Sequence, residues 1–139
     1  VLHLTVEALD LASAYLKPLA GAYVIDHMAR VDAGGGVAQR GFRRLIDLMA
    51  DPRAWVKISA ADRTSAAGAP YHDSLPFMDP LIAAAPDRVL WGTDWPHPNV
   101  RGPVPREEDL LVALAQAAPD EAARRRILVD NPRRLYAFP

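Results

Sequence analysis

A short apolar run, a polar loop and an amphipathic helical segment follow one another four times along this chain of 139 residues. The apolar runs are rich in β-branched and aromatic residues, and the segments after them carry apolar residues at helical spacing. Strands that alternate with helices favour a parallel sheet with helices packed outside it. The strand–helix pairs are expected at residues 1–5 and 6–19, 23–26 and 42–49, 55–59 and 75–85, and 89–91 and 106–118, with a last helix at 120–138.

Composition narrows the function classes. The net charge is −1, so neither a nucleic-acid partner nor an anionic membrane is expected. No cysteine is present, which excludes disulfides and thiolate metal sites. The sequence shows no signal peptide and no apolar run of about 18 residues, so we predict a soluble, cytoplasmic protein. Its length suffices for one domain, residues 1–139, with its own core.

The chain opens on Val1 inside an apolar run rather than on a methionine. Its other end has a helical pattern, with Asp120 and Glu121 at the start and basic residues further on. That order suits the helix dipole. We therefore expect a C-terminal piece of a longer protein.

Polar side chains follow the expected strands at the points where they end. In parallel α/β folds, binding and catalytic groups gather at the C-terminal ends of the strands. No strand leads into a phosphate-binding glycine motif, so nucleotide binding has no support. The residues at these ends are His3, Asp26, His27 and Arg30, Ser59 and Arg63, and Asp94 and His97. An open doubly wound sheet and half of an eight-stranded barrel would both place them so.

Four segments resemble the amidohydrolase-related TIM-barrel hydrolases, and within them the branch of the 2-pyrone-4,6-dicarboxylate lactonases. They are residues 24–30 (VIDHMAR), 55–63, 91–98 (WGTDWPHP) and 130–136 (DNPRRLY). The resemblance covers nearly the whole chain but only the second half of such a protein. It implies the C-terminal half of a (β/α)8 TIM barrel, with four βα units plus a terminal helix.

The resemblance also implies a metal-independent lactonase chemistry for the whole protein, with this piece alone inactive. Asp94 would be the general base that activates water, and His27 would polarise the lactone carbonyl. Arg30 and Arg63 would hold the carboxylates of a small anionic lactone, as forked guanidinium groups do. Ester hydrolysis needs such a base and such donors on the developing oxyanion.

Further residues are expected around the substrate. By the same resemblance His97 would line the pocket. His3, at the end of the first strand, and Tyr71, in the loop that leads to the pocket mouth, are further candidates for substrate binding. Asp26 is expected to face away from His27 along its strand and to be structural.

Two alternatives stay open at this point. In a metal-dependent hydrolase or decarboxylase of the same superfamily, His3, His27 and Asp94 would bind one zinc or manganese ion. The neighbouring arginines argue against this, so no cofactor is expected. Alternatively, the chain is a non-catalytic half barrel, which exposes open strand edges. It would then need a copy of itself, or the missing N-terminal half, as a partner.

Overall fold

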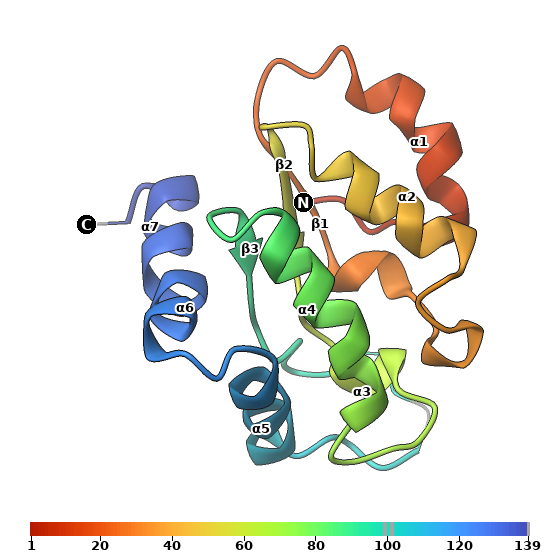
Figure 1. Cartoon of the computed structure of the whole chain (residues 1–139), viewed down its shortest axis with the longest axis vertical. Helices are drawn as coiled ribbons and strands as arrows, with labels where there is room; N and C mark the ends of the chain where they lie inside the picture. The colour runs from red at the N-terminus through yellow and green to blue at the C-terminus, as the bar shows by residue number, and fades with distance from the viewer. Residues whose placement is uncertain (99, 101, 139) are drawn as a thin grey trace.

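The computed structural model describes residues 1–98, 100 and 102–138, and its centre is a parallel sheet (Figure 1). Strands β1 (Tyr23–Ile25), β2 (Ala54–Lys57) and β3 (Val89–Leu90) lie side by side in chain order. Residues 1–5 add only an isolated parallel bridge, between Leu2 and Ile25. The predicted parallel α/β arrangement is therefore confirmed, whereas the count of four complete βα units stays a prediction.

Helices follow each strand, close to where the periodicity predicts them. Short turns also interrupt the long loops, and none of these turns was predicted. The main helices are α1 (Leu9–Leu16) after the turn η1 (Val6–Ala8), α2 (Arg40–Leu48), α4 (Leu75–Ala84) and α5 (Glu107–Ala117). The short turns in the loops are η2 (His27–Arg30), η3 (Ala33–Gly35), α3 (Ala61–Thr64) and η4 (His72–Ser74).

The C-terminal helix is not continuous. Helix α6 (Glu121–Arg125) passes through a π-helical turn, η5 (Arg126–Asp130), into α7 (Asn131–Tyr136). The Asp120 carboxylate caps α6 by accepting the Ala123 amide at 2.9 Å. Asn131 donates to the carbonyls of Pro86 and Val89 at 3.0 and 2.8 Å, which ties α7 to the start of β3.

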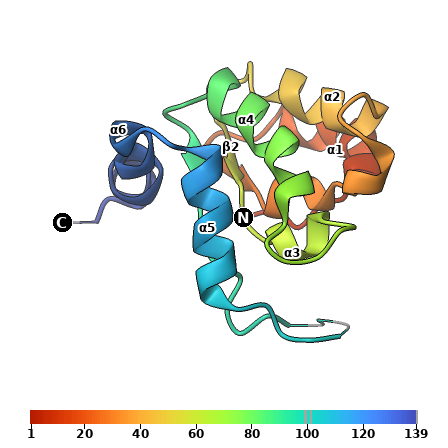
Figure 2. The same ribbon diagram turned by 60° about the horizontal axis from the view of Figure 1, so that its bottom comes forward.

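Each strand divides its side chains between two faces, because successive residues point to opposite sides. One face joins the main core, in which α2, α4 and α5 lie side by side (Figure 2). The other face forms a smaller cluster that Leu135 of α7 partly covers. The main core includes Ile25, Val56 and Val89 with Leu45, Leu81 and Leu114, and the smaller cluster holds Val24, Trp55 and Leu90.

A glycine sets the spacing between the N-terminal turn and α2. A Cβ atom added to Gly41 would lie 2.6 Å from the Cβ of Val6, closer than side chains tolerate. Phe42, next to it, is 2 % exposed and packs edge-on against Phe77, with ring centroids 4.9 Å apart. Burying such a side chain contributes about 1.5–3 kcal/mol. The glycine therefore lets α2 seat this aromatic pair in the core.

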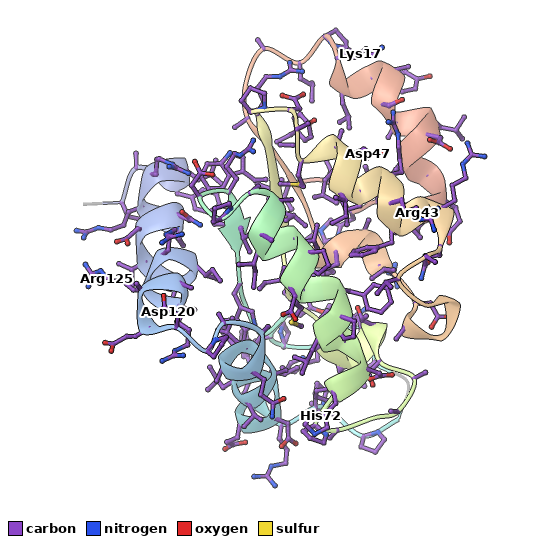
Figure 3. The ribbon with its side chains drawn as sticks, in the orientation of Figure 1. Lys17, Arg43, Asp47, His72, Asp120 and Arg125 are labelled. Atoms are coloured by element: carbon purple, nitrogen blue, oxygen red, sulfur yellow. The ribbon has the colours of Figure 1, made fainter. Side chains whose placement is uncertain are left out.

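Charged side chains lie on the outer surface, among them Lys17, Arg43, Asp47 and Arg125 (Figure 3). Within the described part of the chain, no helix has the length and apolar character needed to cross a bilayer.

Candidate active site at the C-terminal edge of the sheet

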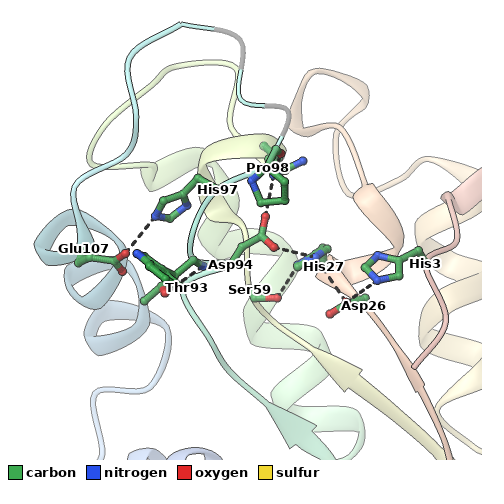
Figure 4. Close-up of polar contacts among 11 residues, drawn as sticks. His3, Asp26, His27, Ser59, Thr93, Asp94, His97, Pro98 and Glu107 are labelled. Carbon is green, nitrogen blue, oxygen red and sulfur yellow. Dashed lines mark hydrogen bonds and ion pairs between the residues drawn. The ribbon is translucent and has the colours of Figure 1, made fainter.

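The polar residues that follow the three strands meet at one edge (Figure 4). Asp26 and His27 come directly after β1, Ser59 lies two residues after β2, and Asp94 lies four residues after β3. The Nε2 atom of His27 is 3.3 Å from the Oδ1 atom of Asp94. The two residues that the sequence assigns to catalysis therefore follow the first and third strands, on either side of β2, and face each other.

An unusual backbone turn presents His27 and Arg30. The residues of η2 all have positive φ angles, from 49° to 53°, although none is glycine. Left-handed geometry costs an ordinary residue roughly 1–2 kcal/mol. Met28 and Ala29 inside the turn are fully buried, so core packing holds this strained conformation. Strain of this kind gathers at functional sites.

His27 has a partner at each ring nitrogen. Its Nδ1 atom lies 2.8 Å from the Ser59 hydroxyl, and its Nε2 atom faces the carboxylates of Asp94 and Asp26, at 3.3 and 3.5 Å. Burial lowers the pKa of His27, and the two carboxylates offset this only in part. His27 therefore stays neutral near pH 7 and can act as a hydrogen-bond donor.

Asp94 lies between the histidine and a guanidinium group. Its Oδ2 atom is 2.7 Å from Nη2 of Arg63, whose side chain is 20 % exposed. Arg63 also donates to the carbonyl of Pro98. The cation stabilises the negative charge of Asp94 and fixes where its carboxylate points.

Asp26 does not face away from His27, so that expectation is wrong. Its Oδ2 atom lies 3.4 Å from Nε2 of His3 and 3.5 Å from Nε2 of His27, and its Oδ1 atom lies 3.1 Å from Nζ of Lys57. The reason is that β1 ends at Ile25, and the strand's alternation does not continue into the left-handed turn. Asp26 thus links both histidines to a lysine.

A cavity of about 800 Å³ reaches these contacts through Arg63, whereas His27 and Asp94 are not among the residues that line it. It contains three residues expected to bind substrate, namely Arg30, Arg63 and Tyr71, together with Asp62 and Asp109. Arg63 joins the cavity to Asp94. Burial raises the pKa of Asp62, and burial together with Asp62 and Asp109 raises that of Tyr71. The cavity therefore has both cationic and acidic walls.

His97 and His3 are not among the residues that line the cavity. His97 is 7 % exposed, and its Nε2 atom lies 3.0 Å from Oε1 of Glu107 at the start of α5. Its predicted place in the substrate pocket stays a prediction. The side chain of His3 is 69 % exposed; its Nε2 atom lies 3.4 Å from Asp26, and its ring lies beside that of His27 with centroids 5.7 Å apart.

Three residues could offer ligand atoms to a metal ion. Nitrogens of His3 and His27 and an oxygen of Asp26 lie within 4.8 Å of one another. The ammonium group of Lys57 already sits 3.1 Å from the other Asp26 oxygen and would lie beside a divalent ion. Because like charges this close repel strongly, these residues fit a metal poorly.

Sequence reasoning missed the roles of Ser59, Lys57 and Asp62. Ser59 was visible as a polar residue at a strand end, but nothing in the sequence pairs it with His27, 32 residues away. Lys57 could have been found from strand alternation, because it shares a face with Trp55 rather than with Val56. Asp62 precedes Arg63 on α3, a single helical turn that the periodicity did not predict.

The fold and the meeting of these residues agree with comparisons to known proteins. The profile of the amidohydrolase family matches residues 5–138, and the chain belongs to this family. It is 42% identical over 137 residues to the 4-sulfomuconolactone hydrolase of Rhizobium radiobacter, covering 97% of this chain and 46% of that protein. It is 36% identical to the 2-pyrone-4,6-dicarboxylate hydrolase of Comamonas testosteroni, covering 94% of this chain and 46% of that one.

Solved structures show the same architecture. A ligand-free Agrobacterium tumefaciens protein, 30% identical, superposes with a TM-score of 0.81 over 96% of this chain and 48% of its own. An Acinetobacter baumannii protein, 24% identical, has a TM-score of 0.82 over 98% and 51%, which shows the fold alone. The resemblance seen in the sequence is thus confirmed. The chain spans about half the length of the curated relatives it matches.

Proposed function

We propose that this chain forms the catalytic edge of a hydrolase that opens an anionic lactone, with Asp94 as the base. The observation that carries this proposal is the position of Asp94. Its carboxylate contacts His27 on one side and Arg63 on the other, and Arg63 also lines the cavity. A base, a neutral donor and a cation thus lie together, and the cation also lines a space large enough for a small molecule.

The chemistry assigned to these groups is ester hydrolysis. Asp94 takes a proton from a water molecule as the water oxygen bonds to the lactone carbonyl carbon. The Nε2–H group of His27 then donates to the oxyanion that forms. When the ring C–O bond breaks, Asp94 returns the proton to the leaving oxygen. The products are one open-chain acid and the regenerated carboxylate.

The substrate class follows from the cations at the cavity. Arg30 and Arg63 offer forked donors that match the oxygens of a carboxylate or a sulfonate. Relatives named 4-sulfomuconolactone hydrolase and 2-pyrone-4,6-dicarboxylate hydrolase act, by their names, on lactones that carry such groups. We therefore assign a lactone bearing at least one carboxylate or sulfonate.

The reaction is proposed to need no metal. Asp26 pairs with Lys57 and Asp94 pairs with Arg63, so each carboxylate already has a cation. A divalent ion would add two positive charges to a site whose charges already balance. The site is also proposed to require a second chain segment or a second copy of this chain, because the chain spans about half of its relatives.

The direct test is a hydrolysis assay with 4-sulfomuconolactone and 2-pyrone-4,6-dicarboxylate as substrates. The chain is assayed alone and co-expressed with the N-terminal half of the Hydrogenophaga intermedia relative, which is 44% identical over 138 residues. Ring-opened product, formed equally with and without a chelator, would support the proposal. A co-purified, folded complex that hydrolyses neither lactone would overturn it. Activity lost with the chelator and restored by zinc or manganese would favour the metal-dependent alternative.

A further inference from the structure

Ser59 stands apart from the other residues around His27 because it carries no charge. It is 2 % exposed, and its hydroxyl lies 2.8 Å from Nδ1 of His27. A serine hydroxyl can donate or accept, so distance alone does not say which atom carries the hydrogen. The contacts of the other ring nitrogen, Nε2, show which atom carries the hydrogen.

Among the described residues, the Nε2 atom of His27 faces two carboxylate oxygens. Asp94 Oδ1 lies 3.3 Å away and Asp26 Oδ2 lies 3.5 Å away. Each carboxylate pairs with a cation, Asp94 with Arg63 at 2.7 Å and Asp26 with Lys57 at 3.1 Å, and a carboxylate in an ion pair accepts hydrogen bonds. A bare nitrogen lone pair at this position would face two negative groups. The hydrogen therefore belongs on Nε2.

A neutral imidazole carries one ring hydrogen, and the other nitrogen is then an acceptor. We propose that Ser59 is a positioning residue whose hydroxyl donates to Nδ1 and holds His27 in the tautomer protonated at Nε2. The remaining titratable neighbour, His3, has its ring centroid 5.7 Å from that of His27, and its Nε2 atom lies 3.4 Å from Asp26. Burial lowers the pKa of His27, which agrees with a neutral ring.

This arrangement gives Ser59 a distinct task. By occupying the Nδ1 lone pair it keeps a proton off that nitrogen and fixes the plane of the ring. His27 then presents a single N–H between Asp94 and Asp26. That this N–H later serves the lactone carbonyl rests on the proposed function, whereas the tautomer rests only on the contacts within this chain.

The experiment reads the tautomer of His27 directly, in this chain and without substrate. Long-range ¹H–¹⁵N correlation spectra at pH 7.5 distinguish Nε2–H, Nδ1–H and doubly protonated rings. The His27 signals are assigned by their loss in His27→Gln. We expect His27 to be neutral and protonated at Nε2. A ring that is protonated at Nδ1, alone or together with Nε2, would overturn the proposal whether or not the chain hydrolyses lactones.

Variants at Ser59 test whether its hydroxyl sets the tautomer of His27. In Ser59→Ala the population protonated at Nδ1 should rise about tenfold, the equilibrium worth of one lost hydrogen bond. Ser59→Thr keeps the hydroxyl and should restore the wild-type spectrum. Ser74→Ala is the matched control, because Ser74 is also a buried serine but donates to the Tyr71 carbonyl. An unchanged His27 spectrum in a folded Ser59→Ala variant would refute the role. If that variant fails to fold, the wild-type spectrum still decides.

Discussion

The two ends of the same parallel sheet treat their polar groups in opposite ways. At the N-terminal end of the strands, the Asp51 carboxylate accepts hydrogen bonds from the backbone amide, Nε and Nη2 of Arg53, at 2.8–3.0 Å, and from the Tyr23 hydroxyl at 3.1 Å. Arg88 donates to the carbonyls of Asp51 and Met49 at 2.8 and 2.9 Å. These groups tie together the loops that precede β2 and β3.

The C-terminal end is left incomplete. Six buried side-chain atoms in the described part of the chain lack a hydrogen bond, and every one belongs to a residue at this end. Two of them, in Asp26 and Asp94, still lie in ion pairs. Positive φ angles at residues other than glycine also gather at this end. Among the described residues, all of them except that of Ala137 lie in loops that follow the C-terminal ends of strands. The atoms that lack a hydrogen bond are Asp26 Oδ1, Asp62 Oδ1, Arg63 Nε, Asp94 Oδ2, His97 Nδ1 and Glu107 Oε2.

The pKa shifts of buried groups also differ between the two ends of the sheet. At the N-terminal end, hydrogen bonds from Arg53 hold the pKa of the Asp51 carboxyl far below its usual range. Burial, with Asp51 beside it, raises the pKa of Tyr23 to about 12. At the C-terminal end, burial raises the pKa of Asp62 instead. Hydrogen bonds at the N-terminal end thus stabilise the fold. In the part of the chain that the structure describes, the C-terminal end keeps buried polar atoms without hydrogen bonds, a pattern typical of sites where stability is lost for the sake of activity.

The largest effect should come from removing the base at the C-terminal end. Asp94→Asn, assayed with the N-terminal half of the Hydrogenophaga relative, should lower lactone hydrolysis at least about a thousandfold, since an amide cannot take the water's proton. Its midpoint of thermal unfolding should fall little. Asp47→Asn, a change at an exposed site on α2, is the control for both measurements. Near-normal turnover in Asp94→Asn would remove this residue from the mechanism.

A substitution at the N-terminal end should instead lower stability. Asp51→Asn should lower the free energy of unfolding of this chain by about 2 kcal/mol, because it weakens charged hydrogen bonds from Arg53. The folded-state pKa of Asp51 is depressed, so its stabilisation is present above the ordinary value of 3.8 and is lost as the pH falls through the folded pKa. Urea unfolding at pH 7 and pH 3 measures this. An equal loss at both pH values would show that packing, not charge, is responsible.

The regular part of the fold was predictable because it depends on local periodicity. Helices α2, α4 and α5 begin and end within two residues of the expected limits. The first strand was overpredicted: its apolar run at residues 1–5 forms only the bridge at Leu2. A strand exists through its neighbours, and on its far side the described chain offers none. The spacing of apolar residues in a sequence does not show whether a neighbouring strand is present.

The site was predictable only in part. His27, Arg63 and Asp94 could be placed at one edge because parallel strands end together. The side-chain directions could not be predicted, since they depend on the left-handed turn at residues 27–30, and no glycine marks that turn. Asp26 was misjudged for this reason. The contact of Ser59 with His27 joins two strands through side-chain rotamers, which no sequence spacing encodes.

The smallest expected effect tests whether the C-terminal end is destabilised by its own charges. Asp62 has a buried oxygen with no hydrogen-bond partner among the described residues, and burial raises the pKa of this carboxyl. The folded chain therefore holds the Asp62 proton to higher pH than the unfolded chain does. Ionised Asp62 consequently lowers stability as the pH rises above 3.8.

Asp62→Asn should raise the free energy of unfolding by up to about 1 kcal/mol at pH 7 and by almost nothing at pH 3. Urea unfolding at both pH values, compared with Asp47→Asn, measures the difference. A loss of stability in Asp62→Asn at pH 7 would mean that this carboxylate is satisfied as firmly as Asp51, and the contrast between the two ends would fail at this residue.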